Sequence, residues 1–97
     1  MTGNYYQGQT VSRQVEFRDR AKALFDPQTI TVVIKKPDGT AVDPAETLTR
    51  ISTGIYELNY DLPSDAPLKI WTIFVTGVSS AGYVEIEKSI FEVFAKP

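Results

Sequence analysis

Two glutamates near the end of the chain come closest to a catalytic arrangement. Glu85 and Glu87 are separated by one residue in a stretch where apolar and polar side chains alternate. On a β-strand such a pair shares one face, about 7 Å apart at ~3.3 Å rise per residue, within the range for an inverting glycosidase. A catalytic acid also needs an apolar pocket that raises its pKa. The alternative, which we favour, is a solvated strand face or a sheet edge blunted against aggregation.

Other familiar catalytic groups are missing. The chain has no histidine and no cysteine, so the commonest general base, the thiol nucleophile and the usual transition-metal ligands are absent. No serine stands in a Gly-x-Ser-x-Gly elbow. The stretch from Gly77 to Gly82 is followed by Tyr83 and Val84, not by the Lys-Ser/Thr of a phosphate-binding loop. We therefore predict that the protein is not an enzyme and binds no cofactor.

Charged side chains offer two weaker alternatives. Five acidic residues could coordinate calcium between loops, although their spacing is not that of an EF-hand: Asp38, Asp43, Glu46, Asp61 and Asp65. Five basic residues could form a phosphate-binding patch at one end of the domain: Arg18, Arg20, Lys22, Lys35 and Lys36. Asp19 and Asp26 interrupt that patch and no stacking platform accompanies it. We favour a turn function for Asp38 and a solvated or partner-facing loop for the basic residues.

Size and composition limit the class of protein. Ninety-seven residues with 42% hydrophobic content form one domain, residues 1–97. A net charge of −2 without a basic stripe argues against nucleic-acid binding, and no apolar run reaches the ~18 residues of a membrane span. The start of the chain lacks the features of a signal peptide and cysteine is absent, so we expect synthesis in the cytoplasm and either a reducing compartment or stabilisation by assembly.

Aromatic residues are more numerous than one small core needs: five Tyr, five Phe and one Trp. We expect four of them to anchor the core: Phe17, Tyr56, Trp71 and Phe91. The others of interest lie at chain ends or loop edges, where exposed aromatics are enriched in protein interfaces. The predicted partner-contact residues are Tyr5, Tyr6, Phe25, Tyr83 and Phe94. The alternative is that these side chains fold back over the ends of the domain.

Alternation of apolar and polar residues predicts strands at 10–17, 29–35, 47–51, 55–62, 69–76 and 83–94. Arg13 interrupts the apolar face of the first, which indicates a sheet edge or the end of a sheet. In the last, Val84 and Ile86 lie on the face opposite Phe91, and we expect a bulge near Lys88 and Ser89 to reconcile them. Residues 18–25 are expected to form a charged loop, and 41–46 to be irregular. The predicted fold is an all-β immunoglobulin-like antiparallel β-sandwich of about seven strands.

Several short motifs carry a resemblance that spans most of the chain. They are Tyr5-Tyr6-Gln7-Gly8-Gln9-Thr10-Val11, the turn Pro37-Asp38-Gly39, the strand entry Thr53-Gly54-Ile55-Tyr56, the linker Pro63-Ser64-Asp65-Ala66-Pro67 before Trp71, and the closing Phe91-Glu92-Val93. This order resembles the macroglobulin-type immunoglobulin-like domains and related single modules of bacterial surface proteins and tailed phages. One departure is Leu68-Lys69-Ile70-Trp71, which lacks the glycine usual before the tryptophan.

The resemblance implies a non-catalytic module that binds protein subunits, either copies of itself or capsid and tail proteins. We expect a virion accessory subunit: a capsid decoration, head–tail or tail protein. The alternative is an extracellular setting, as a cell-surface or secreted adhesion or spacer domain of a larger bacterial protein. A third class, a carbohydrate-binding module, would use Trp71 or Tyr83 as a stacking platform, and it is disfavoured because Trp71 lies in an apolar strand.

Overall fold

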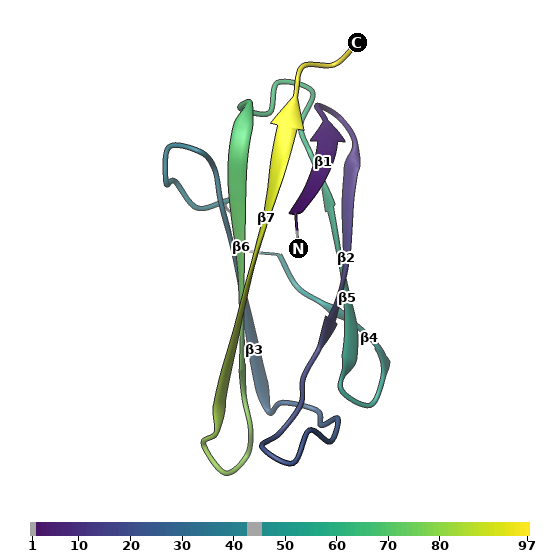
Figure 1. Ribbon diagram of the computed structural model, residues 1–97, viewed down its shortest axis with the longest axis vertical. Coiled ribbons are helices and arrows are strands. Elements are labelled where there is room, and N and C mark those ends of the chain that lie inside the picture. The colour runs from purple at the N-terminus through teal and green to yellow at the C-terminus, as the bar shows by residue number, and fades with distance from the viewer. Residues whose placement is uncertain (1, 43–45) are drawn as a thin grey trace.

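A computed structural model describes residues 2–42 and 46–97 and contains seven strands in two sheets (Figure 1). The strands are β1 (Thr2–Tyr6), β2 (Thr10–Glu16), β3 (Thr29–Lys35), β4 (Thr49–Ser52), β5 (Ile55–Asp61), β6 (Lys69–Val78) and β7 (Val84–Phe94). One sheet has the order β1-β7-β6-β3 and the other the order β2-β5-β4. The predicted all-β sandwich is confirmed.

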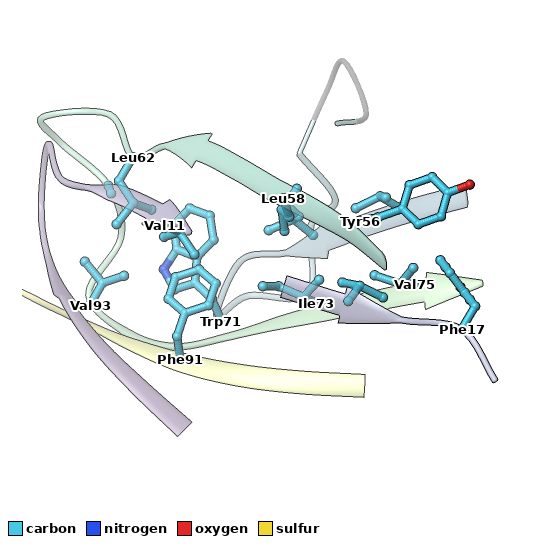
Figure 2. Packing of buried hydrophobic residues seen from close by; sticks show 14 residues of the cluster. Val11, Phe17, Tyr56, Leu58, Leu62, Trp71, Ile73, Val75, Phe91 and Val93 are labelled. Atoms are coloured by element: carbon cyan, nitrogen blue, oxygen red, sulfur yellow. The ribbon is translucent and has the colours of Figure 1, made fainter. Parts of the chain in front are cut away.

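The core forms between the two sheets from residues with a two-residue period (Figure 2). On β6 the inward side chains of Trp71, Ile73 and Val75 are at most 2% exposed. The four predicted core aromatics, Phe17, Tyr56, Trp71 and Phe91, are all buried. Alternation identifies these positions because successive side chains of a strand point to opposite faces of the sheet.

Trp71 is the largest fully buried side chain of this core. Its indole is fully buried and stacks on the Phe91 ring at 5.6 Å between centroids. Its Nε1–H donates a 2.8 Å hydrogen bond to the carbonyl oxygen of Pro67, so the one polar atom of the ring is satisfied. The Pro67 carbonyl belongs to the turn that precedes β6, and the bond ties that turn to the core. A buried Trp71 cannot serve as a sugar-stacking platform.

Strand β1 was not expected from the sequence. It pairs with β7 in parallel, from Thr2 opposite Ile90 to Tyr6 opposite Phe94, whereas the remaining strand pairs are antiparallel. Its sequence, Thr-Gly-Asn-Tyr-Tyr, contains a glycine and an asparagine, which are depleted in strands. The strand β1 therefore forms because it pairs with the edge of β7, and not because its residues have a high propensity for β-strand.

The bulge expected in the last strand is absent. β7 pairs with β6 in one continuous register from Lys69 opposite Val93 to Val78 opposite Val84. Phe91 and Val93 face the core, whereas Val84 and Ile86 lie on the outer face, with exposed fractions of 52% and 65%. The apolar residues change face along β7 because only its C-terminal half packs against the buried core.

Other boundaries differ by a few residues from the prediction. β6 continues to Val78, so Gly77 lies inside the strand rather than in the following hairpin loop. A Cβ on Gly77 would lie 2.6 Å from Cε1 of Phe17, so the glycine makes room for that ring. β2 is an edge strand, as Arg13 indicated. The irregular segment 41–46 falls partly outside the described residues.

We predict that Trp71→Ala lowers the free energy of unfolding by about 3–5 kcal/mol, as large aromatic truncations in cores do. The substitution removes both the stack on Phe91 and the hydrogen bond to Pro67. Urea denaturation followed by circular dichroism measures the loss. Trp71→Phe, which retains most of the apolar surface, should lose less. A loss below about 1 kcal/mol for the alanine variant would contradict the packing described.

Candidate partner-contact surfaces

The predicted contact aromatics divide into two groups at opposite ends of the domain. Tyr6 and Phe94 lie at the end where the chain terminates, which we call the C-terminal end (Figure 1). Their strands place them opposite each other, with ring centroids 6.4 Å apart. Both are exposed, Tyr6 by 51% and Phe94 by 40%. They form one continuous apolar patch rather than two isolated side chains.

Tyr5 is not an exposed contact residue but folds back onto the domain, which was the alternative expected for these aromatics. Its ring meets Phe91 edge-on, at 5.6 Å and 88°, and it is partly buried against the core. Its backbone neighbour Tyr6 points to the opposite face, as alternation along a strand requires. Tyr5 therefore contributes to packing at the C-terminal end, and Tyr6 supplies the accessible ring.

Phe25 and Tyr83 lie at the other end, which we call the hairpin end. Their rings are 6.3 Å apart and half-buried, and Phe25 packs in turn against Phe17. The Arg20 guanidinium lies 5.8 Å from the centre of the Tyr83 ring, within cation–π range. Arg20, Phe25 and Tyr83 line an open cavity of about 800 Å³ between the loop at 18–26 and the hairpin at 79–83. The cavity could accept a protruding side chain of a partner.

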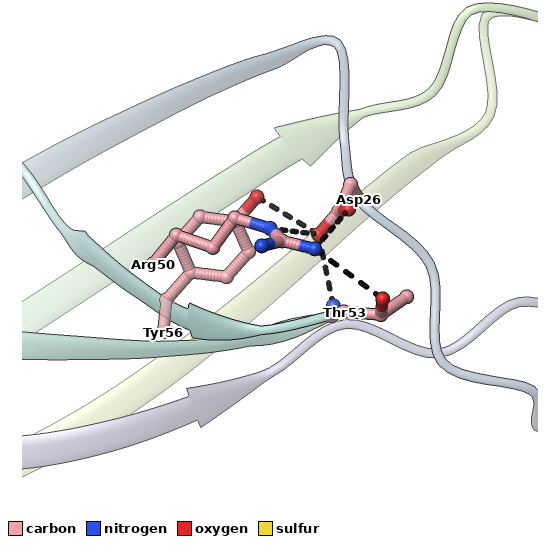
Figure 3. A network of polar contacts seen from close by, with 5 residues as sticks. Asp26, Arg50, Thr53 and Tyr56 are labelled. Carbon is pink, nitrogen blue, oxygen red and sulfur yellow. Dashed lines mark hydrogen bonds and ion pairs between the residues drawn. The ribbon is translucent and has the colours of Figure 1, made fainter.

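The Asp26 side chain connects two segments of the chain near the hairpin end through a network of hydrogen bonds (Figure 3). Its carboxylate accepts hydrogen bonds from the Arg50 guanidinium at 3.2 and 3.1 Å. It also accepts from the Gly54 N–H at 2.9 Å and the Tyr56 hydroxyl at 3.1 Å. Arg50 also donates to the Thr53 hydroxyl at 3.3 Å. One carboxylate thereby joins the loop between β2 and β3 to the β4–β5 hairpin.

These donors change the acidity of the Asp26 site. The hydrogen bonds from Arg50 and Gly54 lower the pKa of Asp26 from 3.8 to about 2, against the opposing effect of burial. Burial raises the pKa of Tyr56, and its hydrogen bond to Asp26 adds to the shift. In the sequence, Asp26 stands out only as an acidic residue that interrupts the basic patch, directly after the charged loop at 18–25. The one available signal was an aspartate before proline, which does not identify partners 24 to 30 residues away.

Gly54 is required where the β4–β5 hairpin meets the loop between β2 and β3. It adopts φ of +71°, and an added Cβ would lie 2.8 Å from the Phe25 nitrogen and 3.0 Å from the Phe17 oxygen. Its carbonyl accepts a 2.8 Å hydrogen bond from the Phe17 N–H. A residue with a side chain would meet both backbone strain and fixed neighbouring backbone atoms.

Glu85 and Glu87 lie on the inner face of β7, but not in a closed apolar pocket. Together with Gln14, Glu16 and Arg18 they line an open groove beside β2. Burial raises the pKa of Glu87, and repulsion from Glu85 and Glu16 adds to the shift. Glu16 forms a 3.2 Å ion pair with Arg18, whereas the Glu85 carboxylate lies 3.5 Å from the Tyr83 hydroxyl. Glu85 and Glu87 therefore form an acidic strip on β7 that is only partly shielded from solvent.

The described residues assemble neither the calcium site nor the basic phosphate-binding patch that the sequence offered as alternatives. Lys35 lies opposite Thr72, whereas the start of β3 lies opposite Val78 beside the hairpin end. Lys35 and its neighbour Lys36 are therefore about 20 Å along the strand from Arg18, Arg20 and Lys22. Asp38 serves its turn by accepting the Thr40 N–H at 2.9 Å. Asp43 lies outside the described residues. Within the described part of the chain, no group of three acidic residues could hold a metal ion.

Comparisons with known proteins identify the fold. No protein-family model and no curated protein matches the sequence. A DUF4785 family protein from Legionella pneumophila matches 95% of this chain with a TM-score of 0.75 at 12% identity. The Lin-41 filamin domain matches 94% of this chain and 82% of its own, with a TM-score of 0.63 at 20% identity. CopC from Methylosinus trichosporium OB3b matches 98% of this chain and 86% of its own, with a TM-score of 0.63 at 17% identity.

These matches, with the two-sheet topology, define the chain as an immunoglobulin-like β-sandwich. Identities this low show the fold alone. The chain spans 26% of the length of the Legionella protein. The macroglobulin-type resemblance remains a prediction. The described residues include no helix with the length and apolar character needed to cross a membrane.

We predict that Asp26→Asn lowers the thermal unfolding midpoint at neutral pH, and that the difference from the unchanged protein disappears as the pH falls. The folded-state pKa of about 2 lies below the ordinary 3.8. The ionised carboxylate therefore stabilises the fold above about pH 4, and this contribution is lost as the pH falls towards about 2.

The measurement is a series of thermal unfolding midpoints over that pH range. Asp65→Asn, which alters an exposed carboxylate at 63–67, is the control and should show a smaller effect. A difference between Asp26→Asn and the unchanged protein that is constant with pH would contradict the role given to Asp26.

Proposed function

We propose that this domain is a non-catalytic structural module that works by binding other protein subunits. The observation that carries the proposal is the exposed aromatic pair at the C-terminal end, Tyr6 and Phe94. Large aromatic side chains lose much unfavourable hydration when a partner covers them, and they commonly dominate the energy of protein interfaces. The two rings are adjacent, so a partner would cover both at once.

The hairpin end supplies a second candidate surface. Tyr83, Phe25 and Arg20 surround the open cavity there, and tyrosine and arginine are enriched among the residues that contribute most to interfaces. The domain measures 45 × 22 × 21 Å, and the two surfaces lie at opposite ends of its long axis (Figure 1). This arrangement supports contacts made end to end with neighbouring subunits.

We further propose that the setting is a tailed-phage virion, in which the domain acts as a capsid decoration, head–tail or tail accessory subunit. This step rests on the resemblance of the turn and strand motifs to single macroglobulin-type modules of phages. An accessory subunit needs accessible binding surfaces and no active site, which agrees with the exposed pair and with the absence of histidine and cysteine.

A second candidate is an adhesion or spacer domain in a larger bacterial surface protein. One observation favours it: similar solved domains occur as parts of longer chains. The chain covers 26% of the Legionella protein and 55% of the structure named GspB Siglec domain. In that setting the two end surfaces would contact adjacent domains of the same chain. Mass spectrometry of purified phage particles and of cell-envelope fractions from the native source distinguishes the two.

We predict that Tyr6→Ala with Phe94→Ala leaves the domain folded but weakens its incorporation into the native assembly at least about tenfold, because interface aromatics commonly contribute more than ~2 kcal/mol each. Circular dichroism tests the fold, and occupancy in the reconstituted particle or complex tests the interface. Ile51→Ala, which removes an equally exposed apolar side chain from β4, is the matched control.

Wild-type occupancy of the Tyr6 and Phe94 double variant would contradict the assignment of this surface. A wild-type protein that stays monomeric and copurifies with no partner from its native source would contradict the proposed function as a whole.

A further inference from the structure

Among the described residues, no strand pairs with the outer backbone edge of the N-terminal half of β7. β6 pairs with β7 along its whole length, but β1 covers only Ile90 to Phe94 (Figure 1). The carbonyl of Ile90 accepts a 3.0 Å hydrogen bond from Arg13 of β2, so it points away from β6. Along an antiparallel strand, the N–H and C=O groups of successive residues point alternately towards and away from a given neighbouring strand. With the register continuous, the N–H and C=O groups of Val84, Ile86 and Lys88 also point away from β6.

Two further hydrogen bonds support this alternation. The Phe94 carbonyl accepts from the Gln7 N–H at 3.1 Å, on the β1 side of β7. On β6, the Val78 carbonyl accepts from the Gln28 N–H at 2.7 Å, on the side away from β7, so Val78 and Val84 do not exchange ladder hydrogen bonds. No strand among the described residues pairs with the outer edge of 84–88, which we call the β7 edge.

A slot between the two sheets opens beside this edge. Its volume is about 300 Å³, and the buried side chains of Leu58, Ile73 and Val75 are among the residues that line it. Gln14 of β2 and Glu87 of β7 are also among its lining residues. A strand added to the β7 edge would project alternate side chains towards this slot and the others onto the outer face of the sheet.

The two sides of an added strand would meet different chemistry. On the inner side lie Glu85 and Glu87, and neither forms an ion pair within the described residues. Glu16 is nearby but already paired with Arg18. Lysine or arginine suits this side, since its aliphatic stem covers apolar surface while its charged end reaches a carboxylate. On the outer side Val84 and Ile86 are 52% and 65% exposed, which favours apolar neighbours.

We propose that the β7 edge binds an extended segment of another protein in which basic residues alternate with apolar ones. The segment pairs with the backbone groups of Val84, Ile86 and Lys88 and lies in line with β1. Its basic side chains face Glu85 and Glu87, and its apolar side chains cover Val84 and Ile86. Main-chain pairing of this kind supplies affinity, while the alternate side chains supply specificity.

The competing explanation is that the charged residues of this strand only protect a solvent-exposed edge from aggregation. Partial burial and the neighbouring carboxylates of Glu85 and Glu16 raise the pKa of Glu87, and a basic side chain beside it would act in the opposite direction. The β7 edge adjoins the hairpin end, where the Tyr83 hydroxyl lies 3.5 Å from the Glu85 carboxylate, but it does not include Tyr6 or Phe94. The function proposed above is carried by that aromatic pair, so the test of the β7 edge can fail without contradicting it.

The experiment titrates the isotopically labelled domain with a short synthetic peptide in which lysine alternates with valine. We expect saturable shifts centred on the β7 edge, and slower hydrogen exchange at the amides of Ile86 and Lys88. A peptide in which glutamate replaces lysine should bind at least about tenfold more weakly, a difference that falls at high salt because charges are screened. Absence of binding by the lysine peptide, or equal binding by the glutamate peptide, would overturn the proposal.

Two variants separate the backbone contribution from that of charge. Ile86→Pro removes an N–H that β6 does not use, which a strand edge tolerates; it should weaken peptide binding about tenfold, whereas Ile86→Thr, which keeps the N–H, should lose less. Glu85→Gln with Glu87→Gln should also weaken binding about tenfold and abolish its salt dependence, with Asp65→Asn as the remote-charge control. If Ile86→Pro does not fold, the glutamine variant decides the proposal alone.

Two results would assign the edge to another occupant. Dimerisation of the free domain that protects the Ile86 and Lys88 amides would show that a second copy occupies it. Protection of these amides in the monomer without peptide would show that the chain itself covers the edge. Either result overturns the proposal.

Discussion

Strand β1 pairs with only the C-terminal half of β7, and this limit determines which parts of the sandwich are closed. Where β1 lies against β7, the inner face carries Phe91 and Val93, and the core is continuous. Where β1 is missing, the inner face carries Glu85 and Glu87, and a slot opens beside β2. At that edge the backbone groups have no partner strand in the part of the chain that the structure describes, and an exposed edge is a template for pairing with another chain.

The two ends of the domain are stabilised by different means. At the C-terminal end, aromatic packing dominates: Trp71 stacks on Phe91, and Tyr5 meets Phe91 edge-on. At the hairpin end, a single carboxylate holds two loops together, since Asp26 accepts hydrogen bonds from Arg50, Gly54 and Tyr56. Each end also presents aromatic side chains beyond what this packing uses. The most accessible of them is the pair formed by Tyr6 and Phe94.

Much of the fold could be predicted from the sequence because its strands alternate clearly. The inward residues of β6 and the core aromatics follow directly from that period. β1 could not be predicted in this way, since its pairing depends on an edge formed by residues almost 90 positions later. The apolar residues at Val84 and Ile86 suggested a bulge, but the register is continuous and they are exposed because they lie on the outer face of β7, away from the second sheet. The Asp26 contacts were missed for a similar reason, because all join segments distant in sequence.

The central claim is that β7 is paired on both sides at one half and on one side at the other. Amide hydrogen exchange in the free domain tests it within a single strand. The account predicts slow exchange at Glu92, whose backbone N–H faces β1, and at Glu87, whose backbone N–H faces β6. It predicts fast exchange at Ile86 and Lys88, whose N–H groups face the open edge. Local exchange rates report such differences in hydrogen bonding. Uniform protection from Val84 to Phe94 would contradict the account, because it would require a further partner along the whole β7 edge.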